Sequence, residues 1–362
     1  MSQPPDHQSP AVLGPATLSA GDRLPFCYGM SGAQRYYSFE EQAGRPSVLI
    51  LAGETPPSAV AALIEAFAAR AADFAARTAD ICVLAKVGAP GWPTARTPEG
   101  VTLVHCMDAA LFLAAGAPPV VLVADRALTL LARLDGDDPA ATLVAALTAL
   151  DGREAGYPAP VLLRPGLLGA ELCRRLIARF EAGGHVEGAM ASIDAEGGAI
   201  NRIDAAKKHR RDLTLDPAEP LHDEVLAALA GRLVPEIAKA FQVQVAHVDR
   251  VLVARYDDTG GYFRRHRDNS SAHTAYREFA LSVNLNAGDY EGGQLLFPEF
   301  DDRAHAPPTG AGFVFSASLL HEAAAVTRGA RYVLLTFLHS PAAEARRQAA
   351  LAASGQAAAQ AS

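Results

Sequence analysis

The residues of this chain that are best suited to chemistry lie between positions 251 and 340. His266 and Asp268 are two residues apart in the stretch YFRRHRDN, and in an extended strand this spacing places both side chains on one face. His321, far along the chain in LLHEAA, can supply a third ligand. Two imidazoles and one carboxylate on one face of Fe(II) leave positions open for further ligands. The spacing therefore predicts a non-haem iron site.

A basic residue follows the second histidine of this set. Arg331 lies ten residues after His321, at the start of the apolar stretch YVLLTFL. A guanidinium buried in such a strand needs an anionic partner. The end carboxylate of a bound 2-oxo acid would provide one, so Arg331 is a candidate cosubstrate-binding residue.

The chain also holds a second copy of the histidine–X–aspartate motif, at His247-Val248-Asp249. This copy lacks the glycine–aromatic approach, GGYF, that precedes His266, and we therefore favour His266. His305 and His339 are not followed at the same distance by a basic residue in a strand, so we do not expect them to be ligands.

Length and charge restrict the class of protein. The 362 residues suggest two domains, half of the residues are hydrophobic, and the formal net charge is -8. This acidic balance argues against a general nucleic-acid or membrane-surface binder. No apolar run approaches the roughly 18 residues of a membrane span, and no secretory signal is visible at the start. We expect a cytoplasmic protein.

The cysteines agree with that location. The four residues (Cys27, Cys82, Cys106 and Cys173) are scattered and form no CxxC pair, so we interpret them as reduced thiols rather than a disulfide framework.

The first half of the chain alternates strands and helices. Apolar strands are predicted at 47–53, 80–87, 101–106, 118–125 and 127–134. Helices are predicted at 57–78 and 109–116, and at 138–152, where Asp138 caps the start and a proline follows. This order predicts a three-layer α/β arrangement.

The second half begins after a Pro- and Gly-rich boundary at 152–159. A short strand leads to an amphipathic helix near Gly169, and a long helix at 221–242 is interrupted by Pro235. From Val245 onward short strands separated by Gly, Asp and Pro turns dominate. This pattern favours a mainly β jelly roll with helices on one side.

The first half resembles the thioredoxin-like (peroxiredoxin-type) redoxin domains, through GDRLPFCYGMSGAQRYYSFEEQAGRPSVLIL and the elements that follow. In that family a reactive cysteine starts the helix after the first core strand, where the helix N-terminus lowers its pKa. Here that place reads GETPPSAV, with Ser58 and no cysteine, while Pro119 matches the position of the family's cis-proline. The resemblance thus implies a scaffold or docking domain rather than a peroxidase.

Residues 160–340 resemble the Fe(II)/2-oxoglutarate-dependent dioxygenases of the prolyl-4-hydroxylase type. The matching signatures follow in order: HRRDLTL, RYDDTGGYF, HRD, LSVNLN, YEGGQLLF, the distal histidine and VTRGARY. The resemblance implies that His266, Asp268 and His321 hold iron and that Arg331 binds the 2-oxoglutarate C5 carboxylate. It also implies that Tyr256 lines the cosubstrate pocket.

Some positions of this resemblance depart from the family or stay open. Either Arg210 or Arg211 matches an arginine before a strand, and Asn284 stands where some members carry another cosubstrate-binding tyrosine. The basic run at 207–211 has no interleaved aromatic residues, and we expect a solvated face or a substrate-pocket rim rather than a nucleic-acid contact.

Together these resemblances imply an α/β plus mainly β protein: a loose arm at 1–20, a thioredoxin-like domain at 21–153, a double-stranded β-helix dioxygenase domain at 160–341 and an Ala-rich tail at 342–362. The implied reaction decarboxylates 2-oxoglutarate with dioxygen and hydroxylates an unactivated C–H, as in a prolyl or other amino-acid side chain. Asp268, a ligating carboxylate, favours hydroxylation over halogenation. Ascorbate is the reductant that the family implies.

The expected partner is a small-molecule or peptide substrate, with no nucleic acid or membrane, and a homodimer stays open. Three alternatives also stay open. They are a thiol peroxidase with an appended β domain, a non-catalytic sensor or binding protein, and a nucleic-acid demethylase that uses the same iron chemistry.

Overall fold

The computed structural model describes residues 18–25, 27–32, 36–107, 110–115, 119–153, 156–193, 199–204, 207–271 and 273–361. Most of the arm expected at 1–20 therefore lies outside the described residues. Contacts divide the chain into two compact units, Met1–Tyr157 with Pro298–Asp301, and Pro158–Phe297 with Asp302–Ser362. No helix in the described part of the chain is both long and apolar enough to cross a membrane.

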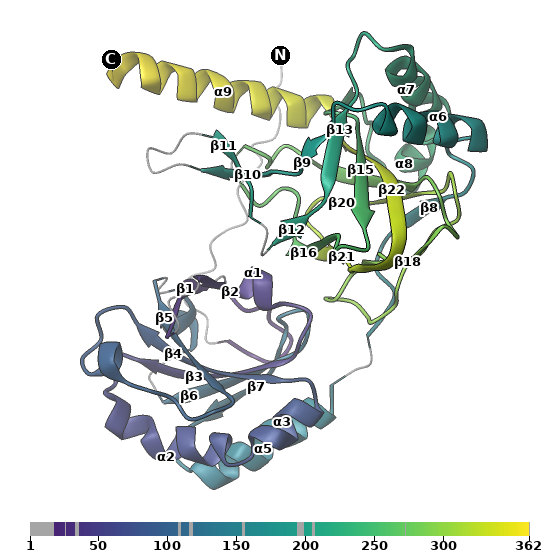
Figure 1. The fold of residues 1–362 in the computed structure, drawn as a ribbon. Helices are drawn as coiled ribbons and strands as arrows, with labels where there is room; N and C mark the ends of the chain where they lie inside the picture. The colour runs from purple at the N-terminus through teal and green to yellow at the C-terminus, as the bar shows by residue number, and fades with distance from the viewer. Residues whose placement is uncertain are drawn as a thin grey trace. The chain divides into compact units, whose positions relative to one another are not determined.

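The first unit is built on a seven-stranded sheet with the order β2-β1-β5-β4-β3-β6-β7 (Figure 1). β3 pairs in parallel with β4 and β4 with β5, whereas the other neighbours are antiparallel. The strands are β1 (Tyr28–Ser31), β2 (Tyr36–Ser38), β3 (Ser47–Gly53), β4 (Asp80–Lys86), β5 (Val101–Cys106), β6 (Val120–Ala124) and β7 (Leu130–Asp135).

Apolar strands explain the centre of this sheet, because every residue of β3 and of β6 is buried. Strands buried on both faces read as continuous apolar runs, as SVLILAG does. Helices α2, α3 and α5 pack against one face and share one hydrophobic core with it. The helical segments are α1 (Phe39–Gln42), α2 (Pro57–Ala68), α3 (Ala71–Ala76), the 3₁₀ turn η1 (Trp92–Thr94), α4 (Ala110–Ala115) and α5 (Pro139–Asp151).

Most of the predicted elements of this unit are confirmed, and two boundaries are wrong. The single helix predicted at 57–78 is divided into α2 and α3 at Arg70, where no Pro or Gly marks the break. β7 begins at Leu130, because Leu128 takes a positive φ of 64° in a turn whose backbone amides donate to the Asp125 carboxylate. The predicted cap of α5 is confirmed, since Asp138 accepts from the amides of Ala140 and Ala141.

The prediction of four reduced thiols is wrong for two of them. Cys27 and Cys106 form a disulfide, although 79 positions separate them. Cys27 directly precedes β1, and β1 pairs with β5, which ends at Cys106, so neighbouring strands bring the two residues together. Such a pairing depends on strand order, which the spacing of the cysteines along the chain does not reveal. Cys82 and Cys173 are free and buried.

The two free thiols are expected to be unreactive in the native protein. Burial raises the pKa of Cys82 to about 12 and also raises the pKa of Cys173, so little thiolate is present at neutral pH. We expect iodoacetamide to label neither residue without denaturant, and to label both once the unreduced chain is unfolded. Rapid labelling of native Cys82 would contradict this and would favour the thiol-peroxidase alternative.

The second unit contains two sheets. The nine-stranded sheet has the order β8-β20-β17-β22-β15-β13-β9, and β14 and β18 each pair with β22 outside this order. The four-stranded sheet has the order β12-β16-β21-β19. Residues of both sheets line one cavity, an arrangement consistent with the predicted jelly-roll core. The strands are β8 (Leu162–Arg164), β9 (Val186–Glu187), β12 (Lys208–His209), β13 (Arg211–Thr214), β14 (His247–Val248), β15 (Leu252–Asp257), β16 (Tyr262–His266), β17 (Phe279–Asn284), β18 (Tyr290–Gly292), β19 (Leu295–Leu296), β20 (Gly312–Ser316), β21 (His321–Ala323) and β22 (Val326–His339).

Three helices cover the larger sheet and share its hydrophobic core (Figure 1). They are α6 (Ala170–Glu181), α7 (Pro220–Arg232) and α8 (Val234–Phe241). α7 and α8 correspond to the predicted helix at 221–242, and Pro235 lies in the first turn of α8, where a missing N–H costs nothing. A separate hairpin consists of β10 (Met190–Ile193) and β11 (Ala199–Arg202).

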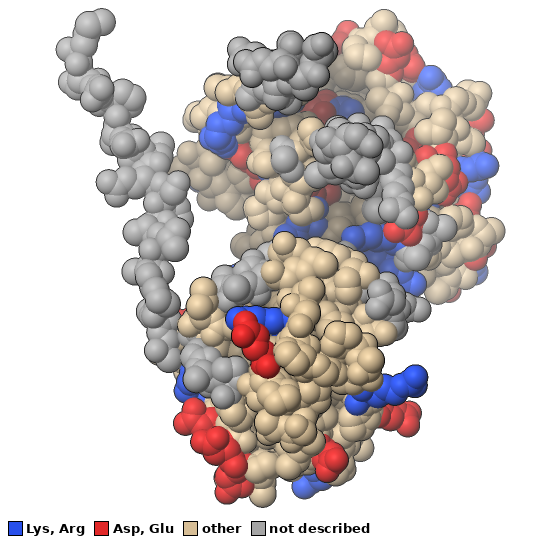
Figure 2. Space-filling model, turned by 90° about the vertical axis from the view of Figure 1, so that its left-hand side faces the viewer, with Lys and Arg blue, Asp and Glu red and all other residues tan. Residues whose placement is uncertain are grey.

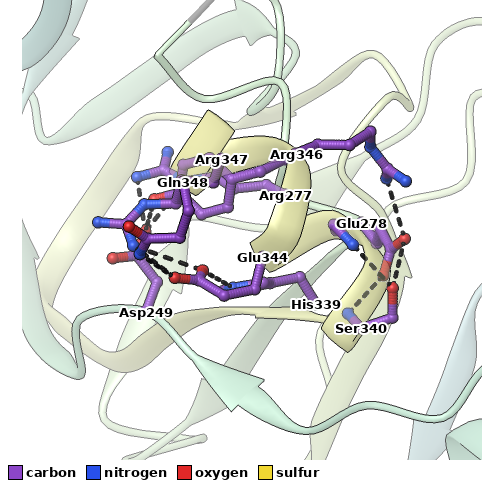
Figure 3. Close-up of polar contacts among 11 residues, drawn as sticks. Asp249, Arg277, Glu278, His339, Ser340, Glu344, Arg346, Arg347 and Gln348 are labelled. Carbon is purple, nitrogen blue, oxygen red and sulfur yellow. Dashed lines mark hydrogen bonds and ion pairs between the residues drawn. The ribbon is translucent and has the colours of Figure 1, made fainter. Parts of the chain in front are cut away.

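The Ala-rich tail forms a helix, α9 (Pro341–Ala361), whose first turns are fixed to the sheet by polar contacts (Figure 3). Ser340 donates from its backbone amide and its hydroxyl to the Glu278 carboxylate, at 2.7 and 3.0 Å. Glu344 accepts from Gln348 and Arg347 and pairs with His339 of β22 at 2.9 Å. These contacts attach α9 to the segment that precedes β17.

Glu344 should make stability depend on pH. The hydrogen bonds from Gln348 and His339 lower its pKa from 4.5 to about 2. Because the folded-state pKa is below the unfolded value, the carboxylate stabilises the fold above pH 4.5, and this contribution is lost as the pH falls towards 2. Glu344→Gln should therefore lower the unfolding temperature at pH 7, with a difference from wild type that shrinks below pH 4.5. A difference independent of pH would contradict this.

Candidate metal centre and cosubstrate pocket

Two neighbouring strands of the four-stranded sheet bring the predicted ligands together. β16 ends at His266 and pairs with β21, so that His266 lies directly opposite His321 with ring centroids 4.2 Å apart. Asp268 follows two residues later and is held by its backbone amide, which donates to the Ala317 carbonyl at 2.9 Å. The strand pairing thus joins residues that are far apart in the sequence.

The three side chains converge on one point. The Asp268 carboxylate lies 3.5 Å from Nε2 of His266 and 3.4 Å from Nε2 of His321. One ligand atom from each of the three residues lies within 4.8 Å of the others. This donor set, two imidazole nitrogens and a carboxylate, suits Fe(II) and leaves coordination positions for other molecules.

Backbone contacts fix which ring nitrogens face the site. Nδ1 of His266 lies 2.8 Å from the Arg264 carbonyl, and Nδ1 of His321 lies 2.9 Å from the Leu319 carbonyl. A carbonyl only accepts, so each Nδ1 carries the proton and each Nε2 keeps its lone pair for a metal ion.

The protonation states also suit metal binding. Burial and the neighbouring His266 lower the pKa of His321 to about 4, so its imidazole is neutral at pH 7. Burial alone would raise the pKa of Asp268, but the adjacent imidazoles of His321 and His266 outweigh it and hold that pKa well below its usual range. A neutral imidazole and an ionised carboxylate are the forms that bind a metal.

The other histidine–aspartate copy is arranged differently. The Asp249 carboxylate accepts from Arg277 and from the Tyr276 hydroxyl (Figure 3 shows the Arg277 contact). His247 instead stacks on His339, and these two residues and Glu344 form a second group with metal-ligand atoms in reach of one another. Glu344 is already bonded within α9. His305 packs edge-on against Phe297 and Phe313.

Arg331 and Tyr256 form a second part of the site. They lie opposite each other on β22 and β15, are 4% and 3% exposed, and the guanidinium carbon lies 5.5 Å from the ring centroid. Among the described residues no carboxylate pairs with Arg331. The Tyr256 hydroxyl accepts from Arg210 at 2.7 Å and can donate its own proton to a ligand. A buried, unpaired guanidinium beside a hydroxyl is suited to a carboxylate.

A cavity of about 320 Å³ joins the two parts, since its lining includes the three candidate ligands, Tyr256 and Arg331. This volume is in the range of small-molecule sites. Asn284 does not line the cavity: its amide donates to the Pro307 carbonyl at 2.8 Å, whereas Ser282 of the same strand does line it.

The basic run at 207–211 divides between the cavity and the surface. Arg210 lines the cavity and Arg211 is exposed. Lys208 and Arg210 are only 2% and 7% exposed and line the cavity, so of the two expected alternatives these residues agree with the pocket and not with a solvated face. Lys208, Arg210 and Asp212 follow one another at a spacing of two residues, and in extended backbone such side chains share a face. This alternation was the sequence signal that the two cations lie beside a carboxylate. Figure 2 shows acidic and basic side chains intermixed on the face that it displays.

Comparisons with known proteins agree with this geometry. The model of the 2OG-Fe(II) oxygenase superfamily matches residues 251–339. This chain contains a 2OG-Fe(II) oxygenase domain. The match supports the sequence-based prediction of a 2-oxoglutarate- and Fe(II)-dependent dioxygenase, and this superfamily implies Fe(II), 2-oxoglutarate and dioxygen.

Two curated relatives are each similar to a part of this chain. Rat multifunctional procollagen lysine hydroxylase and glycosyltransferase LH3 is 25% identical over 195 residues, which cover 52% of this chain and 25% of that protein. A PKHD-type hydroxylase of Picosynechococcus sp. is 27% identical over 125 residues, 34% of this chain and 55% of that protein. The chain thus spans between a quarter and about half of the length of these relatives.

Solved structures with partial likeness include a Pseudomonas putida prolyl-4-hydroxylase, with a TM-score of 0.39 and 22% identity, over 50% of this chain and 93% of that one. The viral collagen prolyl hydroxylase of Paramecium Bursaria Chlorella virus-1 gives a TM-score of 0.38 and 18% identity, over 52% of this chain and 98% of that one.

A glycine next to Arg331 offers a test of the cosubstrate pocket. Gly293 has a φ of 68°, and a Cβ there would lie 2.9 Å from Cδ of Arg331. Gly293→Ala should displace the guanidinium and weaken 2-oxoglutarate binding, and the positive φ should cost about 1–3 kcal/mol of stability. Isothermal titration calorimetry measures the first effect and urea unfolding the second.

Gly288→Ala is the matched control. Gly288 has a φ of 96° and nothing within 4 Å of its added Cβ, so the variant should lose stability without losing cosubstrate affinity. Equal affinities of the two variants would contradict the role assigned to the Gly293 contact.

Proposed function

We propose that this protein hydroxylates an unactivated C–H bond of an amino-acid side chain, free or within a peptide, as a 2-oxoglutarate-dependent dioxygenase. The single observation that supports this most is the convergence of His266, Asp268 and His321 in the cavity that also holds the buried, unpaired Arg331. The curated relatives, by name hydroxylases and in one case a procollagen lysine hydroxylase, motivate the substrate class. A prolyl residue is the first candidate.

In this proposal each residue has a defined task. His266, Asp268 and His321 would hold Fe(II), which when bound couples the oxidative decarboxylation of 2-oxoglutarate by dioxygen to the hydroxylation. Arg331 would pair with the C5 carboxylate of 2-oxoglutarate, and the Tyr256 hydroxyl would donate to it. The Arg264 and Leu319 carbonyls keep the histidine rings oriented. Ascorbate is the proposed reductant that keeps the iron ferrous.

The first unit has a more limited role in the proposal. We propose a thioredoxin-like domain at 21–153 that acts as a scaffold or docking module, joined to the dioxygenase domain at 160–341. The buried Cys82 and the Cys27–Cys106 disulfide give no support to a thiol peroxidase. We also propose that the protein is cytoplasmic and leave a homodimer as a proposal. Cell fractionation tests the location, and light scattering tests the oligomeric state.

The test is succinate formation from 2-oxoglutarate with ferrous iron under air. Wild type should produce succinate slowly even without its substrate, and His266→Ala should not. His247→Ala, in the other histidine–aspartate copy, is the control and should keep wild-type turnover. Failure of the pure protein to bind both iron and 2-oxoglutarate would refute the proposal.

A further inference from the structure

The cavity is strongly cationic in an acidic chain. Seven of the residues that line it are Lys or Arg and one, Asp268, is acidic, whereas the whole chain carries a formal net charge of -8. One cation, Arg331, is accounted for by the carboxylate of the cosubstrate. The remaining excess calls for a separate explanation.

Four of these cations belong to one cluster with too few carboxylates. Lys208 and Arg210 share the Asp212 carboxylate, with contacts at 3.2 and 2.7 Å, and Arg277 pairs with Asp249 at 2.9 Å. The guanidinium of Arg250, which lines the cavity, forms no hydrogen bond or ion pair with any described residue. The four basic side chains thus face only two carboxylates, so basic groups outnumber acidic ones here.

The four groups are close enough to repel one another. Desolvation and the neighbouring charges of Arg277 and Arg210 lower the pKa of Arg250, a residue that lines the cavity and is exposed. Burial, followed by the charges of Arg210 and Arg250, lowers the pKa of Lys208 to about 7. A bound anion would relieve this repulsion.

Lys208 has bonding capacity left for a ligand. Its ammonium donates to the Ala189 carbonyl at 2.8 Å and to the Asp212 carboxylate at 3.2 Å. Among the described residues these are its two hydrogen-bond partners. An ammonium carries three donors, so one is left. The backbone of Gly188 lies close to the ammonium, since a Cβ added at Gly188 would lie 3.0 Å from Nζ. The remaining donor can therefore serve the cavity.

The cluster adjoins the candidate metal centre. Lys208 and Arg210 lie 5.3 and 5.4 Å from the ring centroid of Phe263, and that ring stacks on His266 at 3.4 Å. Nη1 of Arg277 lies 3.4 Å from the backbone carbonyl of Asp268. A molecule whose reacting carbon lies at the metal would thus extend towards these cations.

We infer that the primary substrate carries an anionic group, a carboxylate or a phosphate, which Arg250 and Lys208 bind at the mouth of the cavity. The inference rests on the proposed function and adds to it the charge class of the substrate. Arg250 determines specificity here, since it is accessible and has no protein carboxylate to satisfy it. The same excess charge would attract anions to an otherwise acidic protein.

The test uses probes that differ in charge. Protein saturated with Fe(II) and 2-oxoglutarate without oxygen is titrated by calorimetry with N-acetyl-L-proline, with its uncharged amide, and with inorganic phosphate. We expect at least one anion to bind about tenfold or more tighter than the amide. A preference for the acid indicates a carboxylate substrate, and a preference for phosphate a phosphorylated one.

Two variants distinguish the effect of the cationic cluster from the effect of the protein's net charge. Arg250→Gln should remove most of the preference for the anion and leave 2-oxoglutarate affinity unchanged. Arg174→Gln, at an exposed arginine on α6 that makes the same change in net charge, should keep the preference.

If neither anion binds more tightly than the amide, or if Arg250→Gln keeps the full preference, the inference is overturned. Absence of 2-oxoglutarate binding in the preceding saturation step would instead refute the proposed function.

Discussion

Asp268→Asn is expected to abolish turnover of 2-oxoglutarate while leaving the fold intact. The amide has nearly the volume of the carboxylate, but it removes the only anionic donor of the candidate metal centre, which lies 3.4 and 3.5 Å from the two histidine nitrogens. Loss of an outer-shell partner alone costs 10–100-fold in affinity or activity, so a ligand should cost more than about 100-fold. Succinate formation and anaerobic Fe(II) titration measure the two effects.

Asp223→Asn is the control for this variant. Asp223 lies on α7 with its side chain 82% exposed, so the same chemical change should leave both iron affinity and turnover unaltered. Tight iron binding by Asp268→Asn would show that this carboxylate is not a ligand.

Arg331→Met should have opposite effects on the free and the cosubstrate-bound protein. Without 2-oxoglutarate the variant should unfold at a higher temperature than wild type, because it removes a buried guanidinium that no described carboxylate neutralises. With saturating 2-oxoglutarate the order should reverse, since only wild type gains stability from the ligand. The dissociation constant should rise by at least about 30-fold, as for other buried charge pairs.

Differential scanning fluorimetry with and without 2-oxoglutarate checks this reversal. Arg328→Met lies on the same strand with its side chain 63% exposed, and it should bind 2-oxoglutarate as wild type does. An Arg331→Met protein that is less stable than wild type without ligand would indicate that the guanidinium has a structural role instead.

Periodicity located most of the elements, because their local signals are strong. The apolar run SVLILAG predicted a strand, and Asp138 before a proline predicted the start of α5. The break between α2 and α3 carried no such signal. The Cys27–Cys106 disulfide depends on strand order, which no local pattern contains.

The candidate site likewise contains residues that local sequence signals predicted and residues that only the tertiary structure reveals. The motif spacing brought His266, Asp268, His321 and Arg331 into consideration, and the structure places all four on one cavity. Arg250 was missed because it directly follows the histidine–aspartate copy that was set aside and belongs to no motif of its own. Its significance comes from Arg277 and Lys208, which tertiary folding brings close to it.

The disulfide of the first unit has a practical consequence for work on the second. An assay for ferrous enzymes contains a reductant, and a thiol reductant acts on disulfides as well as on iron. Cys27 and Cys106 are 0% and 2% exposed, so a thiol reaches them only when the first unit opens. Closing a loop of 79 residues destabilises the unfolded chain by about 4.5 kcal/mol. Long storage in thiols should therefore weaken the first unit gradually, whereas ascorbate would keep iron reduced and leave the crosslink in place.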